Sequence, residues 1–474
     1  MVFSSTTFLF LFLPLVLLGH VLLRSIRLRN LFLLVTSLFF YAWGEGFGLC
    51  LMLLCIGVNF WAGLRVEKAK NPRQARSWLI AALGVNLGML IWYKYPNFLI
   101  NNLNYLLLAL RLPTLYLAPV HLPVGISFFI FQALSYVVDV YRGETPAQRN
   151  ILRVALYISL FPQLIAGPIV RYVDVREQMI ARTATLSDFS LGIQRFIVGL
   201  AKKVLLADTL GYVADQLFGA PATALTADAA WLGAVCYAFQ IYFDFSGYSD
   251  MAIGLGRMLG FHFLENFNFP YIAQSIQEFW RRWHISLSTW FRDYLYIPLG
   301  GSRVGPQRTY VNLLIVFFLC GLWHGASWDF VVWGLFHGSF LVLERMGLGG
   351  VLKEIPRVFR HAYVLLVVMV GWVFFRAEGL GNALDYLGAM IGANKNPSYY
   401  AGLYLNGEII FMLVLACIFS TPLYFYFVQK TTQLTERLQG FPLLMHRLAL
   451  LGLFVLSVLT LINSTYNPFI YYRF

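Results

Sequence analysis

Two stretches of the sequence place histidine in apolar surroundings. Residues 278–303 read EFWRRWHISLSTWFRDYLYIPLGGSR, and residues 312–329 read NLLIVFFLCGLWHGASWD. The first stretch contains His284 and the second contains His324. Because an ionisable residue is costly at membrane depth, each histidine is a candidate for function. We expect two neighbouring helices that bring both imidazoles into one catalytic core.

The composition is that of a membrane protein. Of 474 residues, 59% are hydrophobic and only 12% are charged, whereas about a quarter of the residues in a soluble domain are charged. Lipid offers the backbone no hydrogen-bond partners, and the long apolar runs are continuous rather than alternating, which excludes a barrel. We predict an all-α polytopic membrane protein of about a dozen transmembrane or re-entrant helices. It is expected to form a single domain over 1–474, with its catalytic core in 240–340.

The chain carries a formal net charge of +13. In a soluble protein this excess would suggest a nucleic-acid partner, but the sequence has no aromatic-studded basic module that grips a nucleic acid strand. Short cytoplasmic loops of membrane proteins carry excess Lys and Arg. The basic loops at 24–29 and 65–76 therefore indicate the cytoplasmic side and place the N-terminus outside. The expected surroundings are membrane lipid, with no nucleic acid.

The order of apolar and polar stretches predicts the layout of the chain. Membrane spans are expected at residues 7–23, 30–44, 47–64, 77–93, 151–170, 228–243, 251–263, 362–377, 408–428 and 444–463. Pro123 and Gly125 indicate a broken or re-entrant helix. Proline residues also predict a bend within 151–170. Residues 171–187 are expected to form a loop or turn, and 189–218 a helix at the cytoplasmic interface.

The two histidines suggest acid–base chemistry. His324 lies between Gly321 and Gly325, small residues that let a ligand or another helix approach the imidazole. It could act as a general base, or simply form a hydrogen bond between helices. At 100° per residue, a continuous helix would place His284 and Ser288 on one face. His284 could be catalytic or could belong to an aromatic belt at the membrane interface.

Five arginines lie close to the histidines in sequence: Arg281, Arg282, Arg292, Arg303 and Arg308. One explanation is the general excess of positive charge in cytoplasmic loops. Another is a clamp for a phosphorylated cytosolic ligand, because the guanidinium fork matches phosphate geometry. The two explanations are compatible.

Other polar residues have weaker patterns. Cys320 lies four residues before the second histidine, where it could relay an acyl group as a thioester or be an inert buried thiol. Asp250 could pair with Arg257. His337 and the two candidate histidines show no carboxylate spacing typical of a metal site, so no metal is expected.

Together the two stretches resemble the signature of the membrane-bound O-acyltransferases, in particular the bacterial branch typified by alginate O-acetyltransferase. The strings that carry the resemblance are Phe279-Trp-Arg-Arg-Trp-His284, Arg292-Asp-Tyr-Leu-Tyr-Ile, Leu299-Gly-Gly-Ser302-Arg303 and Gly321-Leu-Trp-His324-Gly-Ala. Further similar strings, such as Leu122-Pro-Val-Gly-Ile-Ser-Phe, extend the resemblance over most of the chain. Ser302 stands where the alginate-type pattern more often has Asn, so the resemblance does not identify the polymer.

The resemblance implies a fold and a site. The fold would be a ring of helices around a central tunnel that admits acetyl-CoA from the cytosol and an acceptor hydroxyl from outside. His324 matches the family's essential histidine and would take the acceptor proton. His284 would orient the thioester or stabilise the oxyanion. The coenzyme A phosphates would be held by Arg281, Arg282, Arg303, Lys202 and Lys203.

The resemblance also implies a cellular role. The chain would sit in the bacterial inner membrane and acetylate an exopolysaccharide of the alginate or cellulose type. Transfer would pass through a periplasmic partner acyltransferase or acceptor protein. Two alternatives remain open from the sequence. One is a transporter of an acetyl donor or glycan with the histidines as a proton relay. The other is a scaffold subunit of a polysaccharide synthase.

Overall fold

In the computed structural model, residues 1–423 and 441–464 are described. Within these ranges the chain is helical, and its only extended pairing is an isolated bridge between Leu225 and Tyr399. The predicted all-α class is therefore confirmed. The chain divides into two compact units: the first comprises 1–193 and 252–264, and the second comprises 194–251 and 265–474.

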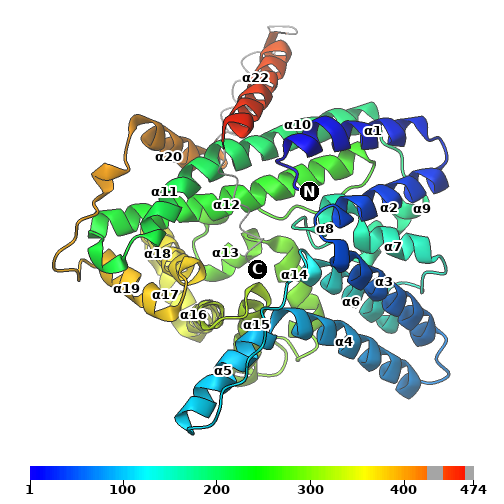
Figure 1. Cartoon of the computed structure of the whole chain (residues 1–474), viewed down its shortest axis with the longest axis horizontal. Coiled ribbons are helices and arrows are strands. Elements are labelled where there is room, and N and C mark those ends of the chain that lie inside the picture. The colour runs from blue at the N-terminus through cyan, green and yellow to red at the C-terminus, as the bar shows by residue number, and fades with distance from the viewer. Residues whose placement is uncertain (424–440, 465–474) are drawn as a thin grey trace. The chain divides into compact units, whose positions relative to one another are not determined.

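The first unit is a bundle of helices from the N-terminal part of the chain. Its helices are η1 (Phe8–Phe12), α1 (Leu13–Leu22), α2 (Ile26–Ala42), α3 (Gly46–Glu67), α4 (Pro72–Lys94), α5 (Pro96–Ala109), α6 (Ile126–Arg142), α7 (Ile151–Ser159), α8 (Phe161–Leu164) and α9 (Tyr172–Ile180). Helices α2, α3, α6 and α7 pack side by side (Figure 1). Asn59 on α3 and Asn86 on α4 exchange hydrogen bonds of 3.0 Å. This exchange satisfies two amides that would otherwise be unpaired in the apolar interior.

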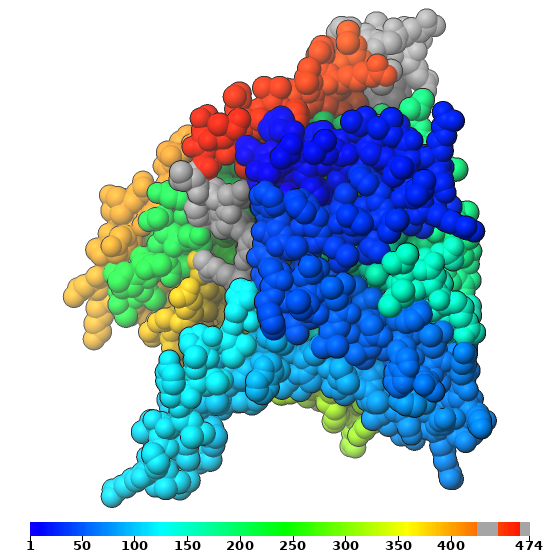
Figure 2. Space-filling model, turned by 45° about the vertical axis from the view of Figure 1, so that its right-hand side comes forward, coloured from blue at the N-terminus to red at the C-terminus, as the bar shows by residue number. Residues whose placement is uncertain are grey.

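The segment that follows α4 forms an arm. After α5 the chain turns at Arg111, whose φ is 57°, and returns along α5 without regular secondary structure. The Asn104 side chain joins the two limbs, because it accepts a hydrogen bond from Leu115 N at 2.8 Å and donates one to Leu115 O at 2.9 Å. Figure 2 shows this arm in cyan, projecting at the lower left of the view.

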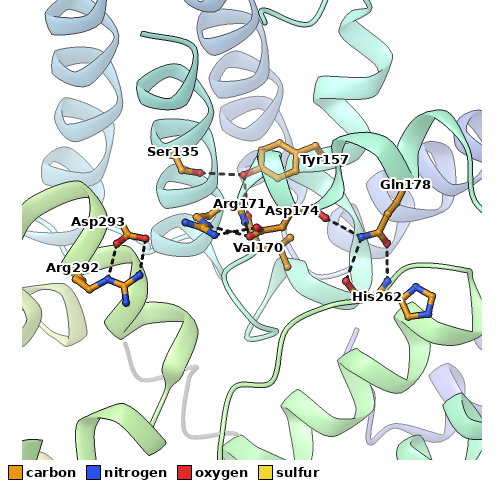
Figure 3. Close-up of polar contacts among 9 residues, drawn as sticks. All are labelled: Ser135, Tyr157, Val170, Arg171, Asp174, Gln178, His262, Arg292 and Asp293. Carbon is orange, nitrogen blue, oxygen red and sulfur yellow. Dashed lines mark hydrogen bonds and ion pairs between the residues drawn. The ribbon is translucent and has the colours of Figure 1, made fainter. Parts of the chain in front are cut away.

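Polar contacts fix the bends of the first unit (Figure 3). The predicted bend is confirmed, since the chain breaks between α7 and α8. The Tyr157 hydroxyl donates to the Val170 carbonyl at 2.9 Å and lies 3.2 Å from Ser135 Oγ. Nearby, the backbone N–H of His262 donates to Gln178 Oε1 at 2.8 Å. These side chains supply the hydrogen bonds that the interrupted helices leave open.

The second unit holds the histidine motifs. Two helices cross from one unit into the other: α10 (Leu186–Ala201) and α12 (Ala227–Met258). The unit's own helices are η2 (Lys202–Ala207), α11 (Asp208–Gly219), η3 (Ala222–Ala224), η4 (Pro270–Ile272), α13 (Ile276–Arg282), α14 (Ile285–Phe291), η5 (Arg292–Tyr296), α15 (Pro306–His324), α16 (Trp328–Leu343), η6 (Glu344–Leu348), α17 (Gly349–Glu354), α18 (Arg357–Arg376), α19 (Leu380–Met390), η7 (Ala401–Leu403), α20 (Gly407–Phe419) and α22 (Phe441–Asn463). Figure 1 shows α11 running beside α12. Gly211 permits this approach, since a Cβ there would overlap the Gln240 amide.

Helices α15 and α16 cross at a pair of glycines. A Cβ added to Gly321 on α15 would collide with the Phe330 carbonyl, and one added to Gly334 on α16 would collide with the Phe317 carbonyl. The two backbones can approach this closely only because both residues lack a side chain. The crossing therefore fixes the helices that carry two of the buried histidines.

Several predicted membrane spans are confirmed. Helices α3, α4 and α18 and the segment Leu444–Asn463 are each long and apolar enough to cross a membrane. Phe8–Leu22 and Gly407–Phe419 are shorter apolar helices. Residues 424–428 of the predicted span 408–428 lie outside the described residues.

Two predictions based on local polarity were wrong. Residues 171–187 include α9 (Tyr172–Ile180) rather than only a loop. The Asp174 carboxylate caps this helix, because it accepts from the Arg171 backbone N–H at 3.4 Å and from the Arg171 guanidinium at 3.1 Å (Figure 3). The expected span 228–243 and the first eight residues of the expected span 251–263 lie in one helix, α12, which ends at Met258. Its polar centre stays helical because its aspartates meet cations inside the protein.

The close crossing of α15 and α16 predicts that a glycine-to-alanine change there lowers stability, whereas the same change at an open position does not. Gly334→Ala should destabilise the protein by about 1–3 kcal/mol, the usual cost of overpacking. Gly88→Ala on α4 is the matched control, because a Cβ there meets nothing within 4 Å and alanine favours helix. Thermal unfolding followed by fluorescence size-exclusion chromatography in detergent measures both. Equal melting temperatures for the two variants would contradict the crossing.

Candidate active site

His284 lies at a break between two helices. Its φ of 43° separates α13 from α14, so the predicted continuous helix through this residue was wrong. The break has a local cause. Asn268 N donates to Arg282 O at 2.9 Å, and Ile285 N donates to Asn266 O at 2.9 Å. The Arg282 carbonyl and the Ile285 N–H, which would bond within a continuous helix, are thus bonded to residues 266–268 instead. Such a left-handed residue is strained, and strain of this kind clusters at functional sites.

The Asn266 side chain also binds the imidazole. His284 Nδ1 lies 3.2 Å from Asn266 Oδ1, and both side chains are buried. Sequence reasoning missed Asn266, because a lone asparagine between Glu265 and Phe267 belongs to no motif. Only the fold brings it across to the histidine.

His324 ends α15 and lies in an aromatic cluster. Its ring centroid lies 4.8 Å from that of Trp323, 5.0 Å from that of Trp333 and 5.1 Å from that of Phe375. The Trp323 ring also lies 6.3 Å from the His284 ring. Both candidate histidines are therefore buried, and both rings lie near the Trp323 indole.

His337 is buried beside the same cluster. Its ring lies 5.4 Å from Trp333 and 5.1 Å from Trp280. A Cβ on Gly371 of α18 would collide with the His337 ring, so this glycine makes room for the histidine. Among the described residues, no three His, Cys, Asp or Glu side chains group closely enough to hold a metal ion. Cys320 is buried on α15, one turn before the end of that helix.

Helix α13 is anchored at its start by an acidic residue. The Glu344 carboxylate accepts hydrogen bonds from Ile276 N at 2.6 Å and Gln277 N at 3.1 Å. A carboxylate at this position satisfies free N–H groups and complements the helix dipole. Burial raises the pKa of Glu344. This contact ties the end of α16 to the helix that leads into the first histidine.

The predicted phosphate-binding arginines differ in availability. Arg281 and Arg303 are exposed, and neither forms an ion pair with a described residue. Arg282 instead pairs with Glu278 at 2.8 Å, one helical turn away. Arg292 pairs with the adjacent Asp293 at 2.7 Å (Figure 3). Of the three arginines predicted to bind phosphate, Arg281 and Arg303 are therefore the ones open to an anionic ligand.

The two predicted lysines are engaged in ion pairs. Lys203 is buried, and its Nζ lies 2.6 Å from Asp208 and 2.9 Å from Asp244. Lys202 lies 2.7 Å from Asp250, the carboxylate that also binds Arg195. These pairs favour a structural role for both lysines rather than phosphate binding.

The predicted pairing of Asp250 with Arg257 was wrong. Asp250 instead binds Arg195 and Lys202 from α10 and η2, and Arg195 also binds Glu265. Residues seven apart lie on one face of a helix, but the cations that meet Asp250 come from the neighbouring elements α10 and η2. Asp250 therefore joins α12 to its neighbours rather than to its own helix.

The burial of Lys203 leads to a test of its role. Lys203→Met should lower the free energy of unfolding by about 3–5 kcal/mol, because it leaves buried carboxylates without a counter-charge. Lys68→Met, at an exposed position between α3 and α4, is the control and should leave stability unchanged. Thermal unfolding in detergent measures both. A Lys203→Met protein of normal stability that binds donor more weakly would restore the phosphate-binding role.

Comparison with known proteins identifies the family of the chain. A family model described as the membrane-bound O-acyltransferase family matches residues 143–380. The chain is 47% identical to a protein of Pseudomonas putida named "Probable alginate O-acetylase AlgI" and 43% identical to its namesake from Azotobacter vinelandii, each over 100% of both chains. It is 38% identical to a peptidoglycan O-acetyltransferase of Helicobacter pylori, over 83% of this chain and 80% of that one. The chain therefore belongs to the membrane-bound O-acyltransferase family and is an acyltransferase.

Proposed function

We propose that the chain carries an acetyl group from cytosolic acetyl-CoA across the bacterial inner membrane to an exopolysaccharide, through a periplasmic partner acyltransferase. The observation that carries this proposal is the pair of buried histidines, His284 and His324, held against the ring of Trp323. The names of the relatives support it, since they are O-acetylating enzymes of alginate and peptidoglycan. The polymer would be of the alginate or cellulose type.

The chemistry follows from the residues of the cluster. Acetyl transfer requires that the acceptor hydroxyl lose its proton, that its oxygen attack the thioester carbonyl, and that the sulfur leave with a proton. Neutral imidazole suits the proton transfers because its pKa is close to physiological pH. A second group must stabilise the charge that develops on the carbonyl oxygen. The two imidazoles divide this work, and the aromatic walls keep water from the thioester.

The donor end of the site is basic. Arg281 and Arg303 are exposed and free of ion pairs among the described residues, so their guanidinium groups can bind the phosphates of coenzyme A. Arg281 precedes His284 by three residues, across the break that ends α13. The phosphate-binding end and the acid–base group therefore lie on the same short segment. The family's implied tunnel would extend this arrangement through the membrane.

The central prediction concerns His324. His324→Ala should lower the rate of acetyl-CoA turnover by about 10²–10⁴-fold, the range for a group that transfers a proton or stabilises the oxyanion in the transition state. His446→Ala on α22, at an exposed position, should leave the rate unchanged. The assay uses purified protein in detergent, without a membrane gradient, and the O-acetyl content of the secreted polymer is the cellular readout. Near-normal turnover by well-folded His324→Ala would remove the assignment.

A second prediction concerns the arginines. Arg281→Glu and Arg303→Glu should each raise the KM for acetyl-CoA by about tenfold or more, because each removes a charge-assisted hydrogen bond and adds repulsion. Turnover at saturating donor should change little. Arg73→Glu makes the same charge change at an exposed position in the first unit and serves as the control. Equal KM values for all three variants would argue against a phosphate site at these residues.

A further inference from the structure

The Asn266 amide forms hydrogen bonds through both its oxygen and its nitrogen. Its Oδ1 lies 3.1 Å from Ser286 N, 2.9 Å from Ser286 Oγ and 3.2 Å from His284 Nδ1. Its Nδ2 donates to Ser249 Oγ at 3.1 Å. Asn266 has no exposed surface, so these contacts are made inside the protein.

These contacts determine where the imidazole carries its proton. A backbone N–H can only donate, so the Asn266 atom that faces Ser286 N must be the amide oxygen. An amide oxygen can only accept, so His284 Nδ1 must carry a hydrogen. In the neutral ring, the other nitrogen, Nε2, then holds a lone pair. The tautomer follows from the backbone donor and does not depend on a choice between amide orientations.

The lone pair of Nε2 faces no protein donor. Nε2 is buried and has no hydrogen-bond partner among the described residues. The ring contacts are with uncharged groups, since Phe245 lies at 4.6 Å, Trp323 at 6.3 Å and Phe267 at 6.5 Å between ring centroids. These surroundings favour the neutral ring. A buried acceptor without a partner is costly, so a hydroxyl that donates to Nε2 would be bound favourably.

We propose that Asn266 is a positioning residue that presents His284 Nε2 to the acceptor hydroxyl, and that His284 takes the hydroxyl proton. This inference rests on the proposed acetyl transfer and deepens it. The O–H bond breaks and its proton moves to Nε2, the oxygen bonds to the carbonyl carbon, and the C–S bond breaks. The imidazolium returns the proton to the leaving sulfur. A neutral ring with a lone pair at Nε2 cannot donate to the oxyanion, so that task falls to His324 instead.

The backbone around His284 supports the same assignment. The bonds from Asn268 N to Arg282 O and from Ile285 N to Asn266 O hold the segment on both sides of the histidine. Asn266 thus fixes the main chain through its carbonyl and the imidazole through its side chain. A group held at both levels keeps one orientation, which is what proton transfer at a defined atom requires.

The test compares two variants of Asn266 that differ in the ability to accept a hydrogen bond. Asn266→Ala should lower kcat by about 10–100-fold, as loss of a partner that orients a histidine does, with KM for acetyl-CoA unchanged. Asn266→Asp keeps the acceptor and should retain most of the activity. Its carboxylate should stabilise the imidazolium, which moves the acid limb of the kcat/KM profile to higher pH by about one unit or more. Asn312→Ala removes another buried asparagine of the same unit and should leave the profile unchanged.

A second measurement separates this inference from the function it rests on. Nitrogen-15 NMR of protein labelled at histidine, with the His284 signals assigned by loss in His284→Gln, reports which ring nitrogen carries the proton. A protonated Nδ1 and a bare Nε2 are expected. A protonated Nε2, or an acid limb that stays in place in Asn266→Asp, would overturn the role of Asn266 even if acetyl transfer is found. The expected tautomer in a protein without any acetyl transfer would instead refute the proposed function.

Discussion

The hydrogen bond between the Asn266 amide oxygen and the His284 ring is the contact on which the site depends. It spans a break in the helical chain, and the break exists because residues 266–268 replace the helical hydrogen bonds that Arg282 and Ile285 give up. In an apolar interior such replacement is obligatory, since an unpaired backbone group is costly there. The same segment thus satisfies the backbone at the interruption and orients the buried imidazole of His284.

Buried charged side chains elsewhere in the second unit are also paired, because an unpaired charge is costly in an apolar interior. Lys203 meets Asp208 and Asp244, and Asp250 meets Lys202 and Arg195. These pairs hold η2 and α10 against α12, whose polar centre could not otherwise remain in an apolar bundle. Basic residues that resemble ligand-binding groups in sequence are therefore partly structural. Arg281 and Arg303 differ because neither forms an ion pair with a described carboxylate.

The features that could be predicted from the sequence are those that follow from composition and local pattern. The helical class, the spans at α3, α4 and α18, and the proximity of His284 and His324 could all be predicted from apolar runs and the quoted motifs. The sequence did not predict the break at His284, because the local pattern around Trp283 and Trp290 is compatible with a continuous helix. The break is imposed by a segment from outside the motif. Asn266 was missed for the same reason.

The break at His284 holds the imidazole ring more firmly than a continuous helix would. In a continuous helix, His284 would have its backbone fully bonded, and its ring would be oriented only by neighbours one turn away. At a left-handed residue between two short helices, the ring instead meets a side chain from residue 266 and aromatic rings from α12 and α15. Three segments that are distant in sequence then hold one imidazole. A reaction that moves a proton between two bound substrates needs a base held from several sides, because neither substrate can orient it before the other arrives.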